Sequence, residues 1–153
     1  LQTNKVKKVV GRAACIQSVD SPRLLEAIAK EAEKQGLTQD LLLELNIGEE
    51  ATKTGAGTEL LYPLLEQAEG LSSVRVRGLM AIPPAFDNSD ASRRCFAMLR
   101  ELLEQARTRH YKNAPLDILS MGMSGSYLAA IREGATLIRV GTAIYGPRDY
   151  PAR

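Results

Sequence analysis

The chain has 153 residues, of which 44% are hydrophobic and 25% charged, and its formal net charge is +2. This is the composition of an ordinary soluble domain with a real core. The small net charge, the absence of tryptophan and the low aromatic content argue against a nucleic-acid partner. The sequence has no signal peptide and no apolar run near the length of a membrane span, so we expect a cytoplasmic protein with no membrane contact.

Strand and helix patterns alternate along the chain. A basic stretch opens it and predicts a solvated helix face over residues 1–10. Short apolar runs predict strands at residues 13–19, 41–47, 74–82, 118–119 and 137–140. Amphipathic segments predict helices at residues 22–36, 58–68, 91–109 and 127–133. Gly78 lies inside the third strand and predicts the close approach of another backbone. Such alternation is typical of a parallel sheet with right-handed crossovers.

The last two predicted strands each end in a loop that contains Gly, Ser or Thr. Ser-Met-Gly-Met-Ser (120–124) follows the first, and Gly141-Thr142 follows the second. In a β/α barrel these loops commonly bind a phosphate, because unpaired N–H groups at a helix start carry positive partial charge and glycine lets them approach. We expect Ser124 to lie on that phosphate. Spacing alone leaves a second interpretation open, in which Ser124 only caps the helix that follows it.

Several blocks of sequence carry a resemblance to a known family. They are Ser-Met-Gly-Met-Ser at 120–124, Ile-Arg-Val-Gly-Thr-Ala-Ile-Tyr-Gly at 138–146, Leu-Gln-Thr-Asn-Lys at 1–5, the loop motif at 46–55, and Arg-Gly-Leu-Met-Ala-Ile-Pro at 77–83. The chain resembles the pyridoxal-phosphate homeostasis proteins of the YggS/PROSC type. These are in turn similar to the N-terminal barrel domain of alanine racemase. The resemblance extends from one end of the chain to the other.

The resemblance implies an α/β fold of the (β/α)8, TIM-barrel type, like the N-terminal domain of alanine racemase. Only about five β/α units are predicted here, and five strands cannot close such a barrel. A free-standing open α/β sheet is the alternative. We expect residues 1–153 to form a single domain, the C-terminal part of the barrel, with three further strands before Leu1, since the chain starts with Leu rather than Met. We expect the full-length protein to be a monomer.

The resemblance also implies pyridoxal 5′-phosphate as the cofactor and assigns residues to it. Ser124, Gly141 and Thr142 would hold the phosphate, Met123 would contribute backbone beside it, and Arg139 would lie beside the pyridine nitrogen. Because arginine is always charged, it would disfavour protonation of that nitrogen and make the ring a poorer electron sink. The alternative is that Arg139 is only a charged residue at a strand end, whose side chain reaches solvent or forms a salt bridge.

Other residues at predicted strand ends are weaker candidates for the site. Asn46, Met80 and Ser120 lie where a barrel places its ligands, although packing or turn chemistry explains each of them. Glu50 and Lys53 match a loop of the family whose role the sequence does not indicate. We expect no metal site.

The lysine that forms a Schiff base with the cofactor in the family has no counterpart in this chain. In the family it ends an apolar strand, and we expect it in a segment before Leu1. We therefore expect no catalytic residue here. A second departure is Ser126, which stands where the family often has Asp. Losing that carboxylate removes a favourable charge at a helix N-terminus, worth ~0.3–1 kcal/mol.

These expectations favour a non-catalytic carrier that regulates the balance of pyridoxal 5′-phosphate and of amino and keto acids. Three other interpretations stay open. The first is a racemase-like enzyme, although racemases take a second acid/base group from a further C-terminal domain for which we expect no room here. The second is a barrel that binds another phosphorylated metabolite, such as a sugar phosphate. The third is a purely structural role.

Overall fold

The computed structural model describes residues 1–47, 55–83 and 89–147. Within these residues one parallel sheet has the strand order β1-β2-β3-β4-β5. The strands are β1 (Cys15–Val19), β2 (Gln39–Glu44), β3 (Val74–Met80), β4 (Ile118–Met123) and β5 (Leu137–Arg139). The helices are η1 (Thr3–Lys5), α1 (Val6–Val9), α2 (Pro22–Lys34), η2 (Thr58–Leu60), α3 (Leu61–Glu69), α4 (Ser89–Arg107), α5 (Tyr127–Arg132) and α6 (Thr142–Tyr145).

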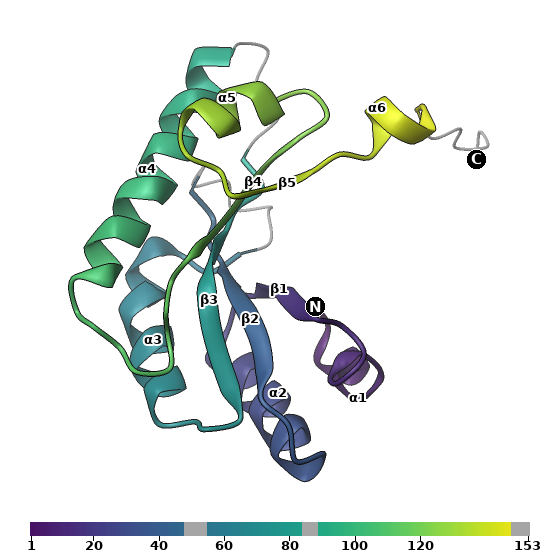
Figure 1. Cartoon of the computed structure of the whole chain (residues 1–153), viewed down its shortest axis with the longest axis vertical. Helices are drawn as coiled ribbons and strands as arrows, with labels where there is room; N and C mark the ends of the chain where they lie inside the picture. Colours follow the sequence, from purple (N-terminus) through teal and green to yellow (C-terminus); the bar gives the residue numbers. More distant parts are fainter. Residues whose placement is uncertain (48–54, 84–88, 148–153) are drawn as a thin grey trace.

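Each strand is followed by a helix, so the chain forms consecutive β/α units of a partial barrel, as predicted. Figure 1 shows α2, α3 and α4 along one side of the sheet, and α6 standing apart from the sheet beyond β5. The largest differences from the predicted strand ends occur in β2 and β4. β2 ends earlier, at Glu44, whose carbonyl accepts a hydrogen bond from the N–H of Ala56 at 2.8 Å. β4 runs further, to Met123, because it pairs there with Arg139 of β5.

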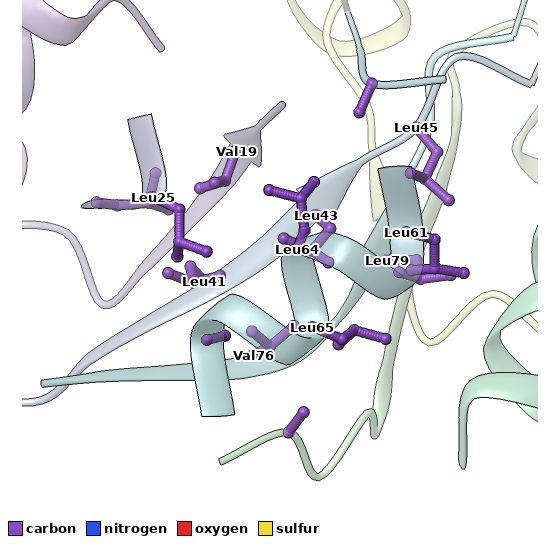
Figure 2. Packing of buried hydrophobic residues seen from close by; sticks show 14 of the residues in the cluster. Val19, Leu25, Leu41, Leu43, Leu45, Leu61, Leu64, Leu65, Val76 and Leu79 are labelled. Carbon is purple, nitrogen blue, oxygen red and sulfur yellow. The ribbon is translucent and has the colours of Figure 1, made fainter. Parts of the chain in front are cut away.

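The hydrophobic core fills the space between the sheet and the helices (Figure 2). Its buried side chains come from both layers and include Val19, Leu25, Leu41, Leu43, Leu45, Leu61, Leu64, Leu65, Val76 and Leu79. The spacing of Phe96, Leu99, Leu102 and Leu103 predicts an apolar stripe on α4. Phe96, Leu99 and Leu103 are buried, and Leu102 is partly buried against the same core. Side chains of a strand alternate between the two faces of the sheet. Leu42 and Glu44 of β2 therefore lie on the face away from the helices, which is the inner face of the partial barrel.

A β-bulge in β3 changes which of its residues face the core. Leu41 of β2 pairs with Val76, but the next residue, Leu42, pairs with Gly78, so Arg77 is the extra residue in the ladder. The alternating pattern of the first half of β3 ends at this bulge, because the following residues, Gly78, Leu79 and Met80, are all buried whichever face they lie on. The bulge also leaves the Arg77 side chain available for ion pairs with its neighbours.

Gly78 is where two strand backbones come closest. It pairs with Ile118 of β4, and a Cβ atom at position 78 would overlap the carbonyl oxygen of Ile118. The close approach predicted from the sequence is confirmed. Glycine is required here because no side-chain atom fits between β3 and β4.

Ion pairs join the amino-terminal ends of β2, β3 and β4. Asp40 accepts hydrogen bonds from Arg75 Nε at 2.7 Å and from Arg77 Nη1 at 2.9 Å, and Arg77 Nε donates to Asp117 at 2.8 Å. Partial burial raises the pKa of Asp40, but the hydrogen bonds from both arginines outweigh it, so this pKa lies below its ordinary value. The hydrogen bond from Arg77 likewise lowers the pKa of Asp117.

Replacing Arg77 by methionine is expected to weaken the acid dependence of stability. A carboxylate whose folded-state pKa is lowered stabilises the fold above its unfolded pKa of about 4 and loses that contribution as the pH falls through the folded pKa. The gap in melting temperature between the wild type and Arg77→Met should therefore be largest near neutral pH and shrink below about pH 4. Lys30→Met, which removes an exposed ion pair with Glu26, serves as the control. If the melting temperatures of the wild type and Arg77→Met differed by the same amount near neutral pH and below about pH 4, the assignment of lowered pKa values to the Arg77 ion pairs would be contradicted.

Candidate functional site

The carboxyl-terminal ends of β4 and β5 border a recess of about 460 Å³. This volume lies within the range of small-molecule pockets. Two loops line it, with Met123, Ser124 and Gly125 from the end of β4 and Arg139, Val140, Gly141 and Thr142 from the end of β5. The structure thus brings every residue that we predicted for the cofactor into one recess. Their role as its ligands stays a prediction.

Ser124 connects the two loops. Its Oγ accepts hydrogen bonds from the N–H groups of Gly141, at 3.1 Å, and Ala143, at 3.2 Å. A serine hydroxyl has two acceptor lone pairs and one hydrogen to donate. Because both lone pairs are used, the hydroxyl hydrogen remains for a further acceptor. An oxyanion bound in the recess that Ser124 lines could be that acceptor.

Ser124 does not cap the helix that follows it. The N-cap residue of α5 is Ser126, and the Oγ of Ser126 accepts a hydrogen bond from the N–H of Met123 at 3.2 Å. The interpretation in which Ser124 only caps its own helix is therefore wrong. Its hydroxyl instead contacts the start of α6, which follows the neighbouring strand.

The guanidinium group of Arg139 is held on the inner face of the sheet. Nη1 donates to Ser120 Oγ at 2.7 Å, and Nη2 donates to the carbonyl of Ala81 at 3.0 Å. Ser120 Oγ in turn donates to Gln17 Oε1 at 2.8 Å. Burial lowers the pKa of Arg139, and the charge of Glu44 opposes that shift. Arginine nonetheless stays charged at neutral pH, so one edge of the recess carries a fixed positive charge.

The weaker candidates have different positions. Ser120 is fully buried and takes part in the Arg139 network, and Met80, its register partner on β3, is buried too. Asn46 is half-buried just after β2 and is not among the residues lining the recess. Glu50 and Lys53 lie outside the described residues. Ser120 accepts a hydrogen bond from Arg139, a residue that lines the recess.

No lysine in the described parts of the chain lines the recess. These lysines are all exposed: Lys5, Lys7, Lys8, Lys30, Lys34 and Lys112. A lysine that forms a Schiff base needs to be held rigidly at the site. The absence of a Schiff-base lysine from this chain stays a prediction, and Lys53 lies outside the described residues.

The described residues contain neither a metal-binding cluster nor a membrane-spanning helix. Residues 1–47, 55–83 and 89–147 contain no group of His, Cys, Asp and Glu side chains arranged to hold a metal ion. Over the same residues, no helix combines the length and apolar character needed to cross a membrane.

Sequence reasoning missed Gln17. It lies in β1, and its contact with Ser120 of β4 joins residues far apart in the sequence. No motif includes it. The signal that could have indicated it is a polar residue between the buried Ile16 and Val19 of a short strand, on the face that a barrel turns inward.

A parallel sheet of consecutive β/α units, with a recess at the carboxyl ends of its last two strands, defines part of a β/α barrel, and β/α barrels place their active sites at that end. Residues 2–149 match the family model described as "Alanine racemase, N-terminal domain". The chain belongs to this family.

Curated relatives carry one recurrent description. A pyridoxal phosphate homeostasis protein from Aquifex aeolicus is 45% identical over 150 residues, which are 98% of this chain and 65% of that protein. Its counterpart from Pseudomonas aeruginosa is 38% identical over 152 residues, which are 99% of this chain and 64% of that protein. The chain thus spans somewhat less than two thirds of the length of these relatives. The resemblance inferred from the sequence blocks is confirmed.

Solved structures agree on the fold. PipY from Synechococcus elongatus, determined with PLP bound, superimposes with a TM-score of 0.86 at 34% identity, over 95% of this chain and 67% of that one. Alanine racemase from Corynebacterium glutamicum gives a TM-score of 0.64 at 15% identity, over 89% of this chain and 36% of that one. The second similarity concerns the fold alone. Together they identify the five units as part of an alanine-racemase-like barrel.

Proposed function

We propose that this chain is the part of a pyridoxal-phosphate homeostasis protein that binds the phosphate and the ring of pyridoxal 5′-phosphate. One observation carries the proposal: the Ser124 hydroxyl, fixed by two backbone N–H groups, retains a hydrogen to donate in a recess that Arg139 also lines. The names of the relatives and the PLP bound to PipY support this choice of ligand. The proposal includes a single domain over residues 1–153 and a cytoplasmic protein that is monomeric at full length.

The residues of the recess fit a phosphate group. Ser124 offers its hydroxyl hydrogen, Thr142 offers a second hydroxyl, and the loop at Gly141 has no side chain to obstruct an approaching oxyanion. Met123, from the end of β4, lines the same recess. Hydrogen bonds to a charged phosphate are stronger than those between neutral groups. These residues would therefore hold the phosphate and fix its orientation.

Arg139 fits the ring end of the ligand. When bound, the cofactor supplies an aldehyde and a pyridine ring that can accept electrons. A permanently charged guanidinium beside the ring nitrogen disfavours its protonation, which limits that electron-accepting capacity. This supports a carrier and regulator of the cofactor rather than an enzyme.

Binding of pyridoxine 5′-phosphate, which lacks the aldehyde, tests the proposal without any covalent step. We expect the protein to bind this probe at least about tenfold more tightly than pyridoxine, which lacks the phosphate, or ribose 5-phosphate, which lacks the ring. Isothermal titration calorimetry measures all three dissociation constants. Equal affinity for ribose 5-phosphate would favour a site for other phosphorylated metabolites, and no binding of any probe would overturn the proposal.

A further inference from the structure

A chain of hydrogen bonds crosses the inner face of the sheet from β5 to β1. Arg139 Nη1 donates to Ser120 Oγ at 2.7 Å, and Ser120 Oγ donates to Gln17 Oε1 at 2.8 Å. Ser120 is fully buried, so water does not compete for its hydroxyl. The three residues come from three different strands, β5, β4 and β1.

The contact between Ser120 and Gln17 depends on the curl of the sheet. β1 and β4 are separated by β2 and β3 in the strand order. In a flat sheet, strands three positions apart lie roughly 14 Å from each other, beyond the reach of a serine and a glutamine. The hydrogen bond can form only because the sheet bends around its inner face. The hydrogen bonds from Arg139 to Gln17 therefore depend on the curvature of the sheet.

The chain of bonds has one possible direction. A guanidinium group only donates, so Ser120 Oγ accepts from Arg139 and its single hydrogen goes to Gln17 Oε1. The second terminal nitrogen, Nη2, donates to the carbonyl of Ala81 at 3.0 Å. Two anchors on separate nitrogens fix the plane of a rigid group. The remaining N–H groups of Arg139 are left at an orientation that these anchors determine.

From this geometry we infer that Ser120 and Gln17 are positioning residues that orient the Arg139 guanidinium toward the ring of the bound ligand. The inference rests on the proposed function, since it assigns Arg139 to the ring end of the pyridoxal-phosphate site. Ser124 and the Gly141 loop hold the other end through separate hydrogen bonds. Breaking this series of hydrogen bonds should therefore weaken recognition of the ring and leave recognition of the phosphate unchanged.

Two substitutions break the hydrogen bonds between Arg139, Ser120 and Gln17 at different points. Ser120→Ala removes the acceptor for Arg139, and Gln17→Leu removes the acceptor for Ser120 while keeping a similar volume. Gln17→Glu keeps an acceptor oxygen and is expected to restore the behaviour of the wild type. Ser73→Ala is the matched control, because it also loses one serine hydrogen bond, from Ser73 Oγ to the Ala29 carbonyl at 2.8 Å, away from the recess.

Ligand titration gives the first measurement. We expect Ser120→Ala and Gln17→Leu to bind pyridoxine 5′-phosphate about fivefold more weakly, the effect of one lost hydrogen bond, with unchanged affinity for inorganic phosphate. Ser73→Ala and Gln17→Glu should match the wild type for both probes. Equal weakening for both probes, or none for either, would overturn the inference.

Nitrogen-15 NMR of the arginine side chains gives a second measurement that needs no ligand. The anchored guanidinium of Arg139 should show separate, slowly exchanging Nη resonances in the wild type, which merge in Ser120→Ala and Gln17→Leu. Separate resonances in both variants would overturn the inference. If the wild type binds no pyridoxine 5′-phosphate, the proposed function fails. The Nη resonances still decide whether the hydrogen bonds through Ser120 and Gln17 order the Arg139 side chain.

Discussion

Replacing Gly78 by alanine is expected to destabilise the fold by about 3 kcal/mol or more, at the upper end of the cost of overpacking. The added Cβ would overlap the carbonyl oxygen of Ile118, so β3 and β4 would have to separate. β4 carries Ser120 and leads directly to Ser124. We therefore expect a lower midpoint of urea unfolding together with weaker binding of pyridoxine 5′-phosphate.

Gly70→Ala provides the control for this prediction. Gly70 has φ −81 as the C-cap of α3, and the nearest atom to an added Cβ is the Gln67 carbonyl oxygen at 3.6 Å, an ordinary contact. Alanine fits there and restricts the unfolded chain, so stability should be unchanged or rise by up to about 1 kcal/mol. If Gly78→Ala and Gly70→Ala unfolded at the same urea concentration, the close contact between β3 and β4 would not be a constraint on the fold.

Replacing Ser124 by alanine is expected to weaken the binding of pyridoxine 5′-phosphate by roughly 1.5–3 kcal/mol, which is tenfold or more. The variant loses the hydroxyl that would donate to the charged phosphate. It also leaves the N–H groups of Gly141 and Ala143 without their acceptor. Both residues are exposed, so water can replace that acceptor and the melting temperature should change little. Titration calorimetry and thermal unfolding measure the two effects separately.

Ser126→Ala is the matched control for Ser124→Ala. Both serines lie in the loop after β4, and Ser126 also accepts a backbone hydrogen bond, from Met123 at 3.2 Å. Ser126 is not among the residues that line the recess, so its loss should change the affinity for the ligand by less than about twofold. Equal weakening by the two substitutions would mean that the loop conformation, rather than the Ser124 hydroxyl, governs binding.

The alternation of elements could be predicted from local patterns. Apolar runs and amphipathic segments predicted the strands and the main helices, because hydrophobic periodicity reflects which side of an element is buried. The ends of β2 and β4 could not be predicted in the same way. Beyond Glu44 the chain forms an isolated bridge with Ala56, and Met123 extends its strand by pairing with Arg139. Both depend on partners distant in the sequence.

The candidate site also has features that the sequence could predict and features that it could not. Ser124, Arg139 and Gly141 fall within one continuous stretch with a strand–loop–helix–strand pattern, so their proximity followed from the order of the elements. The role of Gln17 did not, because β1 reaches β4 only across a curved sheet. The orientation of the Ser124 hydroxyl also needed the structure, since a serine before a helix fits an N-cap equally well.

The sequence by itself determined the alternating β/α order, the glycine at the closest approach of two strands, and the family resemblance carried by contiguous motifs. These are local properties, set by periodicity, backbone sterics and residue type. The tertiary structure alone decided that Ser124 bonds to the start of α6 and that Arg139 is anchored through Ser120 to Gln17. The physical reason is that a hydrogen bond depends on distance and direction in space, and the curl of the sheet sets both for residues far apart in the chain.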